Sequence, residues 1–135
     1  MLWAALALVT AGTFRDLDRR EIPDVVPAAV LLLAIWSVGR MSPRVWVDHV
    51  GGFAVALGVG VALFSTGGFG GGDVKLIAAL GALLGVRDLF TLLFYTALAG
   101  GALAVIAAAR GKRDLAYAPA IALGLLIMLV RRGLP

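Results

Sequence analysis

The sequence contains no cysteine, only one histidine and few charged residues. Without cysteine, the chain has no disulfides, no thiolate metal sites and no cysteine nucleophile. The lone histidine, His49, supplies only one of the three or four protein ligands that a metal site needs. Charged residues make up 15% of the chain, whereas a soluble globular domain carries about 25%. The chain therefore has too few polar groups to cover a surface that faces water.

Apolar residues, by contrast, are abundant. Hydrophobic residues account for 61% of the 135 residues, and the mean hydropathy is +1.01. This composition is typical of a protein embedded in a lipid bilayer. Because a spanning helix takes about 20 residues, the length allows at most about six spans. We expect one membrane domain over residues 1–135, without a separate nucleotide-binding or DNA-binding module.

The basic residues are interpreted in the same way. Twelve Lys and Arg against eight Asp and Glu give a net charge of +4, which in a soluble protein would suggest nucleic acid. Here the basic residues lie in short connections between apolar segments, where such residues set membrane topology. We therefore expect no nucleic-acid partner. With the amino terminus outside, seven of the twelve fall on the cytoplasmic side.

Six apolar segments follow one another along the chain, so the sequence predicts an all-α membrane protein with about six transmembrane helices. A glycine-rich stretch, TGGFGGGD from Thr66 to Asp73, precedes the fourth segment and predicts a break in helical structure. The segments are Met1–Phe14, Val25–Gly39, His49–Thr66, Val74–Val86, Leu89–Ala109 and Leu115–Val130.

Two acidic residues, Asp16 and Asp73, are predicted to lie at the same depth of the membrane. The fourteen residues before Arg15 rise only about 21 Å as a helix, and the thirteen after Asp73 only about 20 Å, against a hydrocarbon core of about 30 Å. Two complete spans separate the two aspartates, so the chain has returned to its starting side. Both carboxyl groups are therefore expected near one membrane face.

A pair of carboxyl groups at one membrane face is suited to acid–base hydrolysis. One carboxylate activates a water molecule, while the other, protonated, polarises the scissile carbonyl and later protonates the leaving amine. The bare backbone of Gly70, Gly71 and Gly72 would let an extended peptide approach closely. Two alternatives stay open, because Asp18 competes with Asp16 for this role and Asp73 could simply cap the following helix.

The residues around both aspartates resemble the type IV prepilin peptidase family of aspartic intramembrane proteases. The segment DLDRREIPD from Asp16 to Asp24 is similar to the first block of that family, and GGGDVKL from Gly70 to Leu76 is similar to its GxGD block with a trailing lysine. The stretch from Tyr117 to Gly124 also resembles the last span of the family. Both blocks occur in order, with two spans between them.

This resemblance implies a function for the chain and a role for each matched residue. It implies a multi-pass peptidase of the cytoplasmic membrane, with its active site toward the cytoplasm, that cuts the basic leader from prepilin-like precursors without metal or cofactor. The chain is similar to the short, peptidase-only members, and homo-oligomerisation stays open. The implied residues are the catalytic pair Asp16 and Asp73, the substrate-binding Gly70, Gly71, Gly72, Glu21 and Asp24, and the supporting Pro23 and Lys75.

Two other classes of function remain as alternatives. In a small transporter or channel component, the broken glycine segment and Asp73 would bind a cation. In a non-catalytic assembly factor of a pilus or secretion system, the fold would persist without the chemistry. Against the transporter, both aspartates lie toward one end of their segments, whereas transporters place such breaks near mid-membrane.

Overall fold

The computed structural model describes residues 2–19, 22–112 and 117–133, and for residues 14–19 it describes the backbone only. Within these ranges the chain is helical throughout, with short connections and no strand, so the prediction of an all-α protein is confirmed. The helices are α1 (Leu2–Arg19), α2 (Val25–Val38), α3 (Pro43–Ser65), α4 (Gly71–Ala109) and α5 (Ala118–Arg131).

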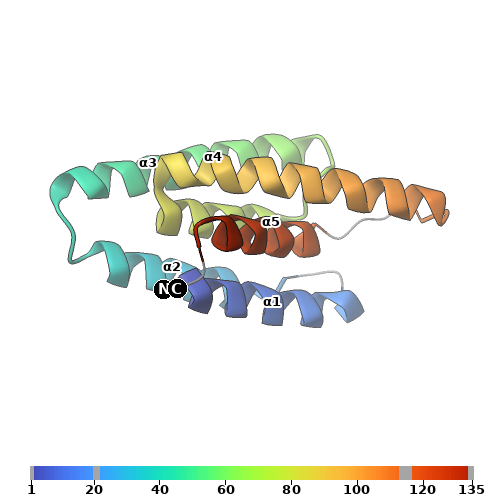
Figure 1. Ribbon diagram of the computed structural model, residues 1–135, viewed down its shortest axis with the longest axis horizontal. Coiled ribbons are helices and arrows are strands. Elements are labelled where there is room, and N and C mark those ends of the chain that lie inside the picture. Colours follow the sequence, from blue (N-terminus) through green and yellow to red (C-terminus); the bar gives the residue numbers. More distant parts are fainter. Residues whose placement is uncertain (1, 20–21, 113–116, 134–135) are drawn as a thin grey trace.

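Helix α4 contains the fourth and fifth predicted segments, joined at Gly85. This residue has φ 80° and ψ 172°, which is not helical, and glycine adopts such a backbone readily because it has no Cβ. Figure 1 shows the chain turning back at this point. We call residues 71–84 the first arm of α4 and residues 86–109 the second arm. The predicted segments on either side, Val74–Val86 and Leu89–Ala109, meet slightly later than this turn.

The number of membrane spans stays a prediction. By length and apolar composition, α3 and α4 are the two described helices able to cross a membrane. The other apolar helical stretches are shorter and comprise Leu2–Thr13, Val25–Val38 and Ala118–Arg131. The coarser prediction of an all-helical, strongly apolar fold is the part that the structure confirms.

Two helix boundaries differ from the apolar segments. Helix α1 continues to Arg19, beyond the apolar segment that ends at Phe14, because charged residues outside the apolar run still sustain helical hydrogen bonding. Helix α3 begins at Pro43, with Ser42 extended before it, rather than at His49. A proline in the first turn of a helix is favourable because its missing N–H would have no partner there. Residues 43–48, which precede the predicted segment His49–Thr66, are therefore helical.

The glycine-rich break before α4 is confirmed, but it is shorter than predicted. Helix α3 ends at Ser65 and α4 begins at Gly71, so only residues 66–70 interrupt the helices. Gly67 has φ 80°, a left-handed conformation that favours glycine. Gly71 and Gly72, which the sequence assigned to the break, form the start of α4.

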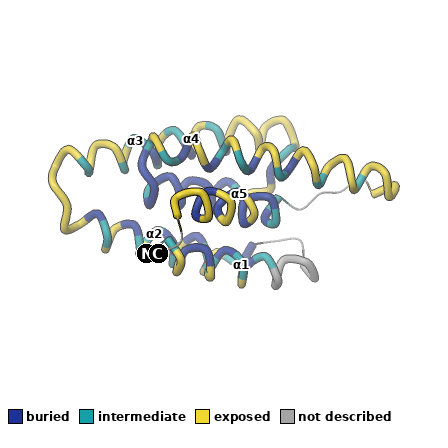
Figure 2. Tube along the Cα trace, in the orientation of Figure 1, coloured by how far each residue is buried: buried dark blue, intermediate teal, exposed yellow. Residues whose placement is uncertain are grey.

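The first arm of α4 is the centre of the fold. Its residues 76–81 are buried, and Leu76, Ile77 and Leu80 are among the largest fully buried side chains. Helix α4 packs against α2, α3 and α5, while α1 packs against α5 and α2. Figure 2 shows burial concentrated inside this bundle and exposure on its outer helices. Asp73 thus lies at the start of the most enclosed helical segment.

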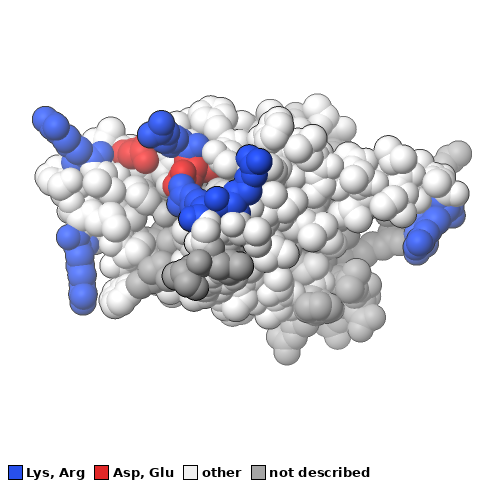
Figure 3. Space-filling view, in the orientation of Figure 1, with Lys and Arg blue, Asp and Glu red and all other residues white. Residues whose placement is uncertain are grey.

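The outer surface of the bundle is apolar. Val25, Val47 and Val105 are at least 70% exposed, and aromatic residues of the second arm, such as Phe90 and Phe94, are also exposed. Soluble proteins rarely expose such extensive apolar surface, which marks membrane or protein contact. Figure 3 shows the charged side chains of this face over its left half, reaching to the middle of the view, and at its right-hand end, with uncharged surface elsewhere.

The end of α1 and the start of α4 lie at the same end of the bundle (Figure 1). Two helices, α2 and α3, separate them in sequence and run in opposite directions. The helix ends on which Asp16 and Asp73 lie are thus at one end of the bundle, and their place at one membrane face stays a prediction. We call this end of the bundle the aspartate end.

Candidate functional site

Asp73 is the third residue of α4, and its carboxylate accepts a hydrogen bond from the backbone of the glycine segment. Gly70 is the N-cap residue with an extended backbone, and its N–H donates to Asp73 Oδ2 at 3.1 Å. This is the carboxylate half of a capping box, which satisfies one N–H at the start of the helix. Asp73 was considered as an N-cap, but the structure assigns that position to Gly70. The side chain is partly buried.

The three glycines before Asp73 have different surroundings. A Cβ added at Gly72 would lie 3.1 Å from the Ile22 Cβ and 3.3 Å from the Ile22 backbone N and O. A Cβ added at Gly71 would meet nothing within 4 Å, and Gly70 is exposed. The lack of a side chain at Gly72 therefore allows close packing within the chain, while Gly70 and Gly71 present accessible backbone.

Lys75 and Asp24 form an ion pair that connects the two blocks. Lys75 Nζ donates to Asp24 Oδ1 at 2.8 Å, and the two residues are 51 positions apart in sequence. Their side chains are 59% and 78% exposed. Asp24 occupies the N-cap position of α2, yet its side chain makes no capping hydrogen bond there. Pro23 precedes it, and the Pro23 carbonyl accepts the Val26 N–H at 3.0 Å in the first turn.

The remaining predicted site residues are only partly described. Asp16 and its rival Asp18 lie on the last turns of α1, but their side chains are outside the described residues. Glu21 also lies outside the described residues. The Asp16–Asp73 pair therefore stays a prediction, as does a role for Glu21.

An aromatic contact that the sequence did not indicate connects the glycine segment to α5. The Phe69 and Tyr117 rings have centroids 5.0 Å apart at an interplanar angle of 53°. Phe69 is 8% exposed, and Tyr117 is the residue before α5. In the sequence, the one sign of this contact was an aromatic residue, Phe69, inside a run of glycines. Burial of this ring anchors a segment that otherwise has little side-chain packing.

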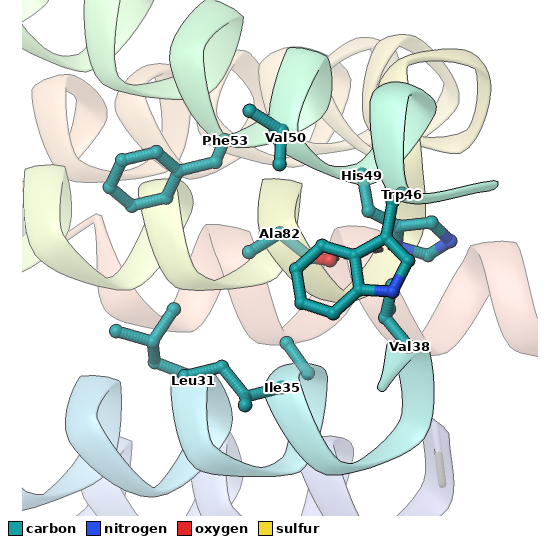
Figure 4. Close-up of a pocket in the computed structure, with 9 residues that line it drawn as sticks. Leu31, Ile35, Val38, Trp46, His49, Val50, Phe53 and Ala82 are labelled. Carbon is teal, nitrogen blue, oxygen red and sulfur yellow. Dashed lines mark hydrogen bonds between the residues drawn. The ribbon is translucent and has the colours of Figure 1, made fainter. Parts of the chain in front are cut away.

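A cavity of about 200 Å³ lies away from the aspartate end, between α2, α3 and the first arm of α4. Its lining side chains are apolar except for His49, whose Nδ1 lies 2.8 Å from the Ala82 carbonyl oxygen. Figure 4 shows Trp46 and His49 of α3 facing Ala82, with Leu31 and Ile35 of α2 below. Ala82 is nine residues from Asp73, about 14 Å along the helix. The cavity is therefore separate from the candidate site.

The family model of the type IV leader peptidase family matches residues 3–105, a range that includes both Asp16 to Asp24 and Gly70 to Lys75. The chain belongs to the type IV leader peptidase family. The match confirms the resemblance on which the two blocks were recognised, and it associates the chain with a family of membrane proteins. No solved structure matches the chain.

Several curated relatives carry the name prepilin leader peptidase/N-methyltransferase. The protein of Bacillus subtilis (strain 168) is 46% identical over 68 residues, which cover 47% of this chain and 27% of that protein. The protein of Neisseria gonorrhoeae is 32% identical over 122 residues, which cover 85% of this chain and 43% of that protein. The protein of Burkholderia pseudomallei (strain K96243) is 31% identical over 128 residues, which cover 92% of this chain and 34% of that protein. The chain thus spans less than half the length of each.

Proposed function

We propose that this member of the type IV leader peptidase family is a membrane aspartic endopeptidase that removes the leader of prepilin-like precursors, with Asp16 and Asp73 as its catalytic pair. The observation that carries the proposal is the contact between the two sequence blocks. Ile22 packs on Gly72, and Asp24 pairs with Lys75. Segments some fifty residues apart thus meet beside Asp73, within the part of the chain that matches the family.

The surroundings of Asp73 suit the role of general base. The first turn of a helix favours a negative charge, because its N–H groups point toward the helix start. The Gly70 N–H also donates to this carboxylate. Asp73 would take a proton from the attacking water, while protonated Asp16 would donate a hydrogen bond to the scissile carbonyl oxygen. Collapse of the tetrahedral intermediate breaks the C–N bond, and a carboxyl proton goes to the leaving amine.

The membrane setting follows from surface composition. A bundle with an apolar outside and charges near its ends suits a bilayer, in which polar side chains avoid the hydrocarbon core. By sequence, seven of the twelve basic residues are predicted to lie on the side of the aspartates. Because short cytoplasmic loops are enriched in Lys and Arg, this bias favours the aspartate end as the cytoplasmic one.

The substrate proposed is a precursor with a short basic leader followed by an apolar helix. Its apolar helix would remain in the bilayer, while the extended segment at the cut lies at the cytoplasmic face. Exposed Gly70 and Gly71 offer backbone groups with which an extended peptide can form hydrogen bonds. Acidic charge near the site, from Glu21 by sequence, would favour a basic leader.

The experiment is co-expression with candidate prepilin precursors, followed by mass spectrometry of the new amino terminus. Asp16→Asn and Asp73→Asn should each abolish cleavage while the protein still accumulates in membranes. Asp48→Asn is a matched control, because Asp48 lies on α3, toward the other end of the molecule. Full cleavage by either catalytic variant would remove that residue from the mechanism. Ion flux lost in Asp73→Asn, without any cleavage by the parent chain, would instead support a transporter.

A further inference from the structure

Two contacts of the described residues 22–24 with the start of α4 carry the argument, and one of them is the ion pair between Asp24 and Lys75. The other is the packing of Ile22 on Gly72. Gly72 and Lys75 are three residues apart on the helix, so they lie on neighbouring positions of one face, about 4.5 Å apart along the axis. The segment 22–24 therefore follows the helix face beside Asp73.

These two contacts have a specific consequence for the geometry of the site. In the described residues, α1 packs against α5 and α2, whereas α4 packs against α2, α3 and α5. Helices α2 and α5, which pack against both α1 and α4, hold the two helices in one bundle, and the segment 22–24 adds direct contacts with the first turns of α4. The Ile22–Gly72 contact sets how closely the segment 22–24 approaches α4. A single contact point, however, leaves this segment free to rotate against the helix. A second point, one turn further along α4, restricts that rotation.

We propose that the Asp24–Lys75 ion pair is a positioning device that holds the end of α1 in register with the first turn of α4. It rests on the proposed function, because its effect on the reaction is to fix where Asp16 stands relative to Asp73. Asp24 then acts through Lys75, within the chain, and does not mainly recruit the basic leader. Lys75 likewise acts on alignment and does not touch the substrate.

The exposure of the pair determines which effect its loss should have. Both side chains are more than half exposed, and exposed ion pairs contribute little to the stability of a fold. Misplacement of catalytic groups by about 1 Å, by contrast, can cost about 10²-fold in rate. Loss of the pair should therefore reduce kcat and leave protein accumulation almost unchanged. A role in leader binding would raise KM instead.

The first part of the test is a charge exchange in the full chain, with a prepilin precursor as substrate. Asp24→Lys and Lys75→Asp should each reduce kcat by up to about 5-fold, the limit set by an exposed ion pair, with little change in KM, and the double variant should recover most of the loss. Lys112→Asp, a reversal of an exposed charge just after α4, is the control and should retain kcat. Failure of the double variant to recover, or an effect confined to KM at Asp24, would overturn the proposal.

The second part does not depend on activity. Because the chain has no cysteine, spin labels can be attached specifically to Leu17→Cys and Gly71→Cys, and a Cβ at position 71 meets nothing within 4 Å. The label-to-label distance distribution should broaden when Lys75→Asp is added and narrow again in the charge exchange. An unchanged distribution would overturn the positioning role. If the distances respond but the parent chain cuts no precursor, the proposed function fails and the positioning role stands.

Discussion

Ile22 lies against Gly72 so closely that any side chain at position 72 would meet it. A Cβ there would stand 3.1 Å from the Ile22 Cβ and 3.3 Å from two of its backbone atoms, closer than ordinary van der Waals contact. Because backbone atoms cannot rotate away as a flexible side chain can, the segment after α1 would have to shift. The missing side chain of Gly72 is thus what lets the two sequence blocks meet.

Gly72→Ala should therefore impair the site more than it impairs folding. Overpacking of this kind costs about 1–3 kcal/mol, and displacement of the segment 22–24 should lower the cleavage rate at least about 10-fold. Gly101→Ala, at a position of α4 where a Cβ meets nothing within 4 Å, is the matched control. Cleavage assays with thermal unfolding in detergent would measure both effects, and wild-type cleavage by Gly72→Ala would contradict the close packing.

Two substitutions of Asp73 should separate its two roles. Asn keeps an oxygen that can accept the Gly70 N–H, whereas Ala removes it. Both should reduce cleavage by about 10²–10⁴-fold or more, because neither can act as a base. Asp73→Ala should also lose about 1 kcal/mol of stability through the missing cap interaction. Thermal unfolding of both purified variants measures this difference, and equal stability would show that the hydrogen bond contributes nothing.

Gly85→Ala should destabilise the fold without touching the candidate site. The backbone of this turn, with φ 80° and ψ 172°, costs a residue with a Cβ about 1–3 kcal/mol, and that Cβ would also contact the Asp48 carboxylate. We expect a lower midpoint of thermal unfolding and reduced accumulation in membranes. An unchanged midpoint would argue against the turn at this residue. Size-exclusion chromatography of the detergent-solubilised variant would detect any loss of compactness.

Phe69→Ala should loosen the glycine segment before α4. The buried ring packs on Tyr117, and removing a buried aromatic side chain costs about 3–5 kcal/mol. Tyr117→Phe keeps the ring contact and should behave as the parent chain. Hydrogen exchange of residues 66–72, followed by mass spectrometry, should speed up in the first variant only. Equal exchange in both would mean that the ring does not anchor the segment.

Local properties of the sequence predicted the elements of this fold well where one residue type dominates. Apolar runs indicated the helices, since each must shield its backbone polar groups by internal hydrogen bonding. The helix boundaries agreed less well with the ends of the apolar runs, because hydropathy does not indicate where helical hydrogen bonding starts or stops. Pro43 set the start of α3 ahead of its apolar run, and α1 continued through charged residues to Arg19.

The sequence alone determined the helical class, the glycine break and the two blocks that place the chain in its family, because these depend on residue type and short-range spacing. Only the tertiary structure decided which residues of the two blocks meet. Lys75, assigned only a supporting role from the sequence, pairs with Asp24, and Gly72 packs on Ile22. Such contacts join residues about fifty positions apart, so they arise from how the helices pack and not from local preference.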